Sequence, residues 1–201
     1  FTTGGLDLDT YKAYTDNGQS FTLDMGGADV SGTGDTALST DRGYTGGHDD
    51  GGDINILDVG TIDTGVIETL CSRRSYGGAD GARCGDLTIG ESGTPAGAVR
   101  VDSIRAGRKY DGTDSSVVGW GGDVTVYSNS DVTIAEDSAG TNPGDINTGG
   151  YGDSGGDITV HHDGTFRAGK LISWSHSRKV SWGSAGDVDF DGDLADDGVD
   201  P

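Results

Sequence analysis

One short block recurs six times along the chain, and this repeat constrains the fold more than any other feature of the sequence. The blocks alternate apolar and polar residues, which is the pattern of a β-strand with one buried face. Successive blocks begin 33, 33, 37, 34 and 30 residues apart. Five of them open with Asp after Gly, and the six are SFTL at 20–23, DINI at 53–56, DLTI at 86–89, DVTV at 123–126, DITV at 157–160 and DVDF at 187–190.

Two further strand-like blocks follow within the repeats. One is centred on Val30, Ile62, Val99, Val132, Phe166 and Leu194, and the other on Leu38, Ile67, Ile104, Ile146 and Leu171. Three short strands per repeat, joined by turns rich in Gly and Asp, predict one coil of a parallel β-solenoid. We therefore predict an all-β fold without substantial helix, a three-sided parallel β-helix with about six coils of 30–37 residues.

The predicted solenoid is a single domain that spans residues 1–201. Coils start near residues 20, 53, 86, 123 and 157, with partial coils at 1–19 and 187–201. The Gly before each Asp is expected to supply a positive φ at a sharp corner. An antiparallel sandwich is the alternative fold, because short strands and Gly-rich turns suit it as well.

The composition is that of a disordered chain unless its apolar residues stack. Leu, Ile, Val and Phe make up about 18% of the residues and the net charge is −21, so scattered apolar residues would not offset the ordering entropy. In a solenoid, however, a few inward residues per coil merge into one continuous core. With 31 Asp against 3 Glu and few other helix formers, a helical bundle is excluded.

The two ends of the chain are complementary partial coils. Residues 8–15 match 38–45, which predicts that the chain begins with a third strand and its loop, whereas 187–201 resembles a first and a second strand. Copies placed head to tail, with 1–19 against 187–201, would complete one coil across the junction. Either the chain is a filament subunit whose contact does not close, or it is a segment of a longer solenoid.

The charge and the cysteines indicate where the protein works. A charge of −21 repels nucleic acid, and no run approaches the roughly 18 apolar residues of a membrane span. Cys71 and Cys84 flank one loop and are predicted to form a disulfide, which favours an extracellular or cell-surface location.

An acidic run near the C-terminus is a candidate calcium site. Oxygen ligands at alternate positions with Gly192 at the sixth resemble a calcium loop, although the twelfth position is Gly198 instead of Glu. The same residues also fit the repeat as a strand. Calcium is the one cofactor indicated, and its candidate ligands are Asp187, Asp189, Asp191, Asp193 and Asp197.

A second acidic set recurs at the start of the blocks, namely Asp53, Asp86, Asp123, Asp157 and Asp187. Stacked carboxylates repel one another unless something neutralises them. We expect backbone amides of the preceding Gly-Gly pairs to cap these carboxylates, with calcium as the alternative.

Basic and aromatic residues recur at one loop position and are predicted to line one edge of the solenoid. They are candidates to hold a glycan or a neighbouring acidic subunit, or they only pack on one another. The candidate edge consists of Arg42, Tyr44, Arg74, Tyr76, Arg108, Tyr110 and Trp182.

No catalytic residue is predicted. His161 and His162 follow a strand without a Ser-His-Asp or metal-binding spacing. A polysaccharide lyase is therefore the least favoured hypothesis, and we expect a protein that is not an enzyme.

The motifs GGDITV, GGDVTV and GGDINI, with their third-strand partners, resemble secreted and cell-surface right-handed parallel β-helix proteins, including haemagglutinin-type adhesins. The resemblance implies a structural or adhesive role outside the cell and carries over no catalytic residue. The leading hypothesis is a secreted solenoid that polymerises head to tail, and the alternative is a glycan-binding adhesin domain.

Overall fold

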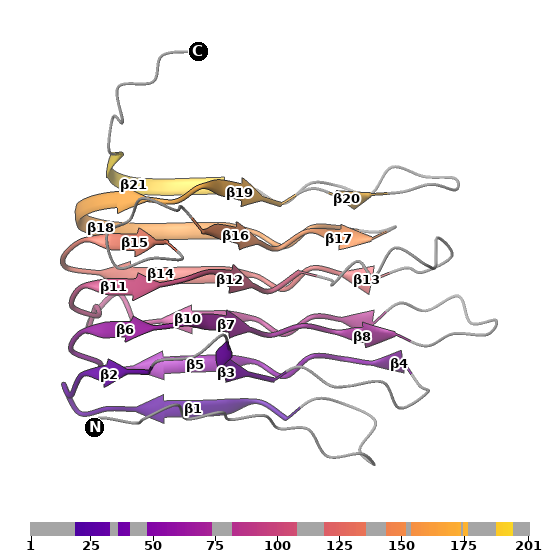
Figure 1. Cartoon of the computed structure of the whole chain (residues 1–201), viewed down its shortest axis with the longest axis horizontal. Coiled ribbons are helices and arrows are strands. Elements are labelled where there is room, and N and C mark those ends of the chain that lie inside the picture. Colours follow the sequence, from indigo (N-terminus) through magenta and orange to yellow (C-terminus); the bar gives the residue numbers. More distant parts are fainter. Residues whose placement is uncertain are drawn as a thin grey trace.

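The fold is all-β. A computed structural model describes residues 19–32, 36–40, 48–73, 82–107, 119–135, 144–151, 154–173, 175–176 and 188–194. Within these ranges the regular structure is strand, and no helix occurs. Strands stack layer upon layer along the molecule, from β1 near the N-terminus to β21 (Figure 1). The prediction of an all-β chain without substantial helix is thus confirmed for the described residues.

The six repeated blocks are strands that pair in parallel. Phe21, Ile54, Leu87, Val124, Ile158 and Val188 occupy equivalent positions in neighbouring strands. Parallel pairing contradicts the antiparallel sandwich. The strands are β1 (Phe21–Asp24), β5 (Ile54–Leu57), β10 (Leu87–Ile89), β14 (Val124–Ser128), β18 (Ile158–Arg167) and β21 (Val188–Leu194).

The second and third blocks form two further parallel sets. The second set is β2 (Val30–Ser31), β6 (Ile62–Thr64), β11 (Val99–Val101), β15 (Val132–Ile134) and the end of β18. Because β18 belongs to both the first and the second set, the two form one sheet of ten strands. The third set is a five-stranded sheet of β3 (Thr36–Ser39), β7 (Val66–Glu68), β12 (Ile104–Arg105), β16 (Asp145–Asn147) and β19 (Lys170–Ile172).

Three small two-stranded sheets lie on the loops that follow the third set (right side of Figure 1). One pair is antiparallel, β4 (His48–Asp49) with β8 (Ser72–Arg73). The other two are parallel, β9 (Ala82–Arg83) with β13 (Gly119–Trp120) and β17 (Gly150–Tyr151) with β20 (Ser175–His176).

The core is a continuous file of inward side chains. Ile54, Val124 and Ile158 of the first set are fully buried, as are Ile62 and Val132 of the second. A fully buried Val, Leu or Ile contributes about 1.5–3 kcal/mol, and here the inward residues of the stacked strands belong to one hydrophobic cluster. This stacking explains how a chain with few apolar residues acquires a core.

The Gly residues directly before the blocks that start at 86, 123 and 157 are required for close approach of the backbones. A Cβ on Gly85 would collide with the carbonyl oxygen of Gly52, one on Gly122 with that of Gly85, and one on Gly156 with that of Gly122. The expected positive φ is wrong for these residues, since the described positive-φ glycines are Gly26, Gly27 and Gly90. The spacing between repeats leaves no room for a side chain at this corner.

We expect Gly122→Ala to lower the free energy of unfolding by about 3 kcal/mol, because the added methyl group must push two repeats apart. Gly93→Ala is the matched control: its Cβ would meet nothing within 4 Å, so the change should stay within about 0.5 kcal/mol. Urea unfolding followed by circular dichroism measures both. Equal stability of the two variants would contradict the proposed packing constraint.

Candidate functional site

The loops after the third strand set have closed bases. Thr69 Oγ1 donates a hydrogen bond to the Gly85 carbonyl oxygen at 2.6 Å, and Gly85 N–H donates back to the Thr69 carbonyl at 2.9 Å. Thr148 and Gly156 repeat this reciprocal pair at 2.7 and 2.8 Å. Buried hydroxyl–carbonyl pairs therefore hold both ends of these two loops together, so their length can vary without disturbing the stacked strands.

A disulfide bond joins Cys71 and Cys84, as predicted. Both residues are buried, and in the sequence they lie between Thr69 and Gly85, on the loop side of that pair. The bond is therefore a covalent second closure of the same loop base.

The predicted basic and aromatic edge belongs to these loops, but its residues lie outside the described ranges. These residues are Arg42, Tyr44, Arg74, Tyr76, Arg108, Tyr110 and Trp182. Whether they form one edge stays a prediction.

Part of the predicted calcium run is strand. Asp189, Asp191 and Asp193 lie on β21, which pairs with β18, whereas Asp187 and Asp197 are outside the described residues. In the described part of the chain, no group of three or more His, Cys, Asp or Glu side chains is arranged to hold a metal ion. Calcium binding by this run stays a prediction.

Carboxylates at the start of the blocks form an aspartate ladder, which we define as Asp53, Asp86, Asp123 and Asp157. Each Asp after Asp53 donates its backbone N–H to the Oδ1 of the Asp one repeat earlier. The three bonds are Asp86 to Asp53, Asp123 to Asp86 and Asp157 to Asp123, each 2.9 Å long. The donors are thus amides of the next Asp, whereas the sequence led us to expect those of the preceding Gly-Gly pair.

Within the ladder, Asp86 has a shifted pKa. Burial raises the pKa of its carboxyl above the ordinary value, and the carboxylates of Asp123 and Asp53 add to the rise. The Asp123 N–H and the Arg83 guanidinium, 3.5 Å from Asp86 Oδ2, act in the opposite direction. The hydrogen bonds of the ladder therefore join successive repeats, while burial of the Asp86 carboxylate opposes its ionisation.

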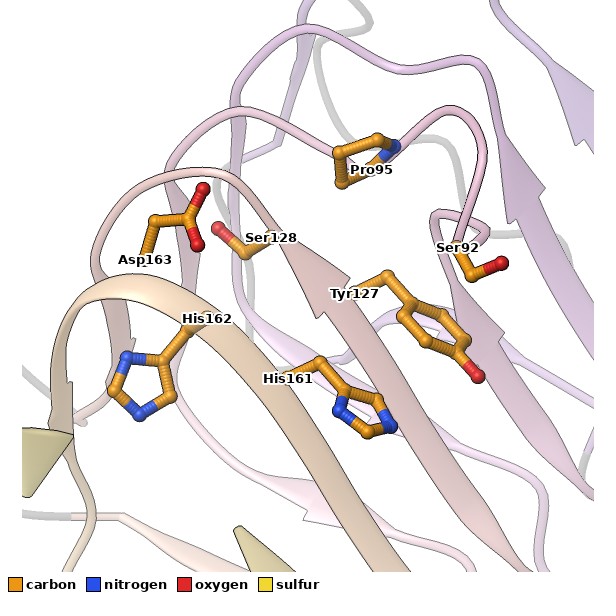
Figure 2. A pocket seen from close by; sticks show the side chains of 7 residues that line it. All are labelled: Ser92, Pro95, Tyr127, Ser128, His161, His162 and Asp163. Atoms are coloured by element: carbon orange, nitrogen blue, oxygen red, sulfur yellow. The ribbon is translucent and has the colours of Figure 1, made fainter. Parts of the chain in front are cut away.

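An open groove lies at the turn between the first and second strand sets (Figure 2). We call it the Tyr127 groove; it has a volume of about 460 Å³. Within it, the Tyr127 and His161 rings stack, with their centroids 4.7 Å apart and an angle of 10° between their planes. The lining residues are Ser92, Pro95, Tyr127, Ser128, His161, His162 and Asp163.

The stack follows from the register of two neighbouring strands. Tyr127 of β14 pairs with His161 of β18, so their side chains leave the sheet on the same face. The sequence indicated no catalytic spacing at His161 and did not single out Tyr127. Their equivalent positions in two successive repeats were the signal that could have identified the stack.

His162 points to the opposite side of β18 and is only 4% exposed (Figure 2). Its Nδ1 lies 2.9 Å from the carbonyl oxygen of Gly164, so Nδ1 carries the proton. Nε2 is buried and has no hydrogen-bond partner among the described residues. The His162 ring packs near Phe166, with 6.0 Å between the ring centroids, and is part of the buried interior.

In comparisons with known proteins, no family model, curated protein or solved structure matches the chain. A search of the described residues for a helix long and apolar enough to cross a membrane found none.

We expect the double variant Cys71→Ala/Cys84→Ala to lose about 3 kcal/mol of unfolding free energy, because the unfolded chain regains the entropy of the open loop. The Thr69–Gly85 pair should preserve the fold, so the circular dichroism spectrum should not change. The measurement is urea unfolding, with Cys84→Ala as a control that should match the double variant. An unchanged urea midpoint would contradict this role of the disulfide.

For Asp86 we expect opposite results from two substitutions. Between the pKa of an unfolded Asp, about 3.9, and the raised pKa of Asp86, the folded state binds more protons than the unfolded state. The free energy of unfolding therefore falls as pH rises through that window, and this contribution is lost at neutral pH. Asp86→Asn keeps an oxygen that accepts from Asp123 N–H and removes the charge, so it should be at least as stable as the wild type at neutral pH.

Asp86→Ala removes the acceptor and should cost about 1 kcal/mol. Urea unfolding at neutral pH and just above the unfolded pKa of about 3.9 separates the two effects. A destabilised Asp86→Asn at neutral pH would argue against the burial effect.

Proposed function

We propose that the chain is an extracellular structural protein, a subunit that assembles head to tail into a filament or matrix fibre. Its strands would form a three-sided solenoid of about six coils, with 1–19 of one copy completing the partial coil 187–201 of the next. The observation that carries the proposal is the unbroken register from Phe21 to Val188, because a parallel stack can continue into another copy without changing its pattern.

Both ends of this stack are edge strands in the described part of the chain. β1 pairs with β5 on one side, β21 pairs with β18 on one side, and no described strand lies beyond either. Unpaired strand edges expose N–H and C=O groups that recruit other chains. Two such edges on one molecule, both parallel and in the same register, favour a contact that repeats without closing.

The direction of individual N–H groups on β1 makes the edge testable. Phe21 N–H donates to the Asp53 carbonyl and Met25 N–H to the Leu57 carbonyl, both toward β5. Because alternate residues of a parallel strand serve opposite neighbours, Thr22 N–H is directed to the outer edge.

The other expectations fit this proposal to different degrees. The disulfide favours an oxidising location such as the cell exterior. A glycan-binding adhesin that uses the Arg and Tyr edge, and calcium held by Asp187 to Asp197, remain separate hypotheses that rest on the sequence alone. A lyase stays the least favoured hypothesis, since His161 stacks on Tyr127 and the His162 Nδ1 bonds to the Gly164 carbonyl oxygen.

We expect Thr22→Pro to abolish filaments, because proline removes an outward donor while the bonds of Phe21 and Met25 to β5 are kept. Thr22→Ala is the matched control: it keeps the N–H and should form filaments like the wild type. Negative-stain electron microscopy and sedimentation velocity over a range of concentrations, with and without calcium, give the readout. Monodisperse wild-type particles under all conditions, or filaments of Thr22→Pro equal to those of the wild type, would refute the proposal.

A further inference from the structure

The Tyr127 groove combines an aromatic platform, an inserted turn and polar groups in one place. We propose that it binds a neutral pyranose unit of a glycan, with the sugar ring against Tyr127 and its hydroxyl groups on Ser92 and Asp163. This site differs from the Arg and Tyr edge predicted from the sequence, and it does not depend on filament formation.

The platform has His161 on one side and a glycine at the equivalent position of the neighbouring repeat on the other. His161 stacks on one side of the Tyr127 ring. On the other side, the equivalent position of β10 is Gly90, directly after Ile89, which pairs with Val126. Gly90 has no side chain and a φ of +69°, and an added Cβ would strike the Tyr127 carbonyl oxygen. The repeat therefore omits a side chain beside the ring.

The adjoining turn is longer than its counterparts. Residues 90–98 connect β10 to β11, whereas 58–61 connect β5 to β6 and 129–131 connect β14 to β15. The insertion is ordered by two reciprocal backbone bonds of 3.1 Å between Glu91 and Thr94. It brings Ser92 and Pro95 to the groove (Figure 2), so the extra length of this repeat is used to build a wall.

The polar groups of the lining suit hydroxyl groups. Asp163 is exposed and its carboxylate only accepts hydrogen bonds, and the Ser92 hydroxyl both donates and accepts. The Ser128 hydroxyl is already engaged, since it donates to the Gly97 carbonyl oxygen at 2.6 Å. A pyranose offers several hydroxyl groups around an apolar ring face, which matches a carboxylate and a hydroxyl next to an aromatic ring.

Charge and size select the kind of sugar. Asp163 and the net charge of −21 disfavour an acidic saccharide, so a neutral one is expected. The volume of about 460 Å³ lies in the usual range of small-ligand sites, roughly 300–1,000 Å³. The groove is open, so a sugar within a longer chain also fits.

Saturation-transfer NMR with cellobiose, maltose and lactose tests the proposal on the whole chain, with digalacturonate as the acidic comparison. We expect signals from at least one neutral disaccharide and weaker ones from digalacturonate. Tyr127→Ala should weaken binding at least about tenfold because the platform is lost, whereas Tyr127→Phe keeps the ring and should bind.

Two further variants make the test independent of folding defects. Ser92 lies on an exposed turn, so Ser92→Trp should fill the groove and abolish binding. The fold should stay intact, which circular dichroism checks. Thr125→Ala changes an outward residue of the same strand that does not line the groove and should bind normally. Absence of signal for all neutral disaccharides, preference for digalacturonate, or full binding by Ser92→Trp would overturn the proposal. The filament assay on Ser92→Trp should be normal, which separates this site from self-assembly.

Discussion

The backbone-to-backbone contact between successive repeats is the interaction on which the rest of the structure depends. Parallel strands lie about 4.8 Å apart. The backbones at the corners between strands must therefore also pack at about this distance. At the corners before the blocks that start at 86 and 123, this leaves space for a glycine only, as the contacts of Gly85 and Gly122 show. The abundance of Gly is therefore a property of stacking, and it also explains why so few apolar residues are enough: each one is shared with the layers on both sides.

The same spacing decides how a strongly acidic chain stacks at all. The aspartate ladder sets carboxylates one above another, yet the Oδ1 atoms of Asp53, Asp86 and Asp123 each accept an N–H from the next repeat. A backbone amide is a donor that cannot be lost by mutation to any residue except proline. Asp86, which is the group with a raised pKa, shows that burial makes this arrangement costly, whereas the bond itself stabilises the contact.

Much of the fold could be predicted from the sequence because its signal is local and repeated. The alternation in DINI or DVTV identifies a strand, and the recurrence identifies its partners. What could not be predicted depends on the register of neighbouring strands and on the space between their backbones. Gly122 has the same sequence signature whether it is needed for φ or for close approach, and only the position of the Gly85 carbonyl decides. The donors of the aspartate ladder were assigned to the wrong amides for the same reason, since neighbours across repeats count more than neighbours along the chain.

The Tyr127 groove was missed for a related reason: Tyr127, His161 and Gly90 are unlike one another, and they form a site only because the register places them side by side. By contrast, Cys71 and Cys84 were paired correctly because the closing residues of one loop must meet.

The aspartate ladder also has a direction. The carboxylates of Asp53, Asp86 and Asp123 each accept from the repeat that follows. At the start of the series, Ser20 Oγ takes the place of a carboxylate for Asp53 N–H. A stack built in this way has a direction, because all of these hydrogen bonds point the same way along it. Two such stacks that met in opposite orientations would set acceptor against acceptor, or donor against donor, whereas the same orientation pairs each donor with an acceptor. Any fibre formed by continuing the ladder would thus have chemically distinct ends, one that presents amides and one that presents carboxylates, and it would have to grow differently at each.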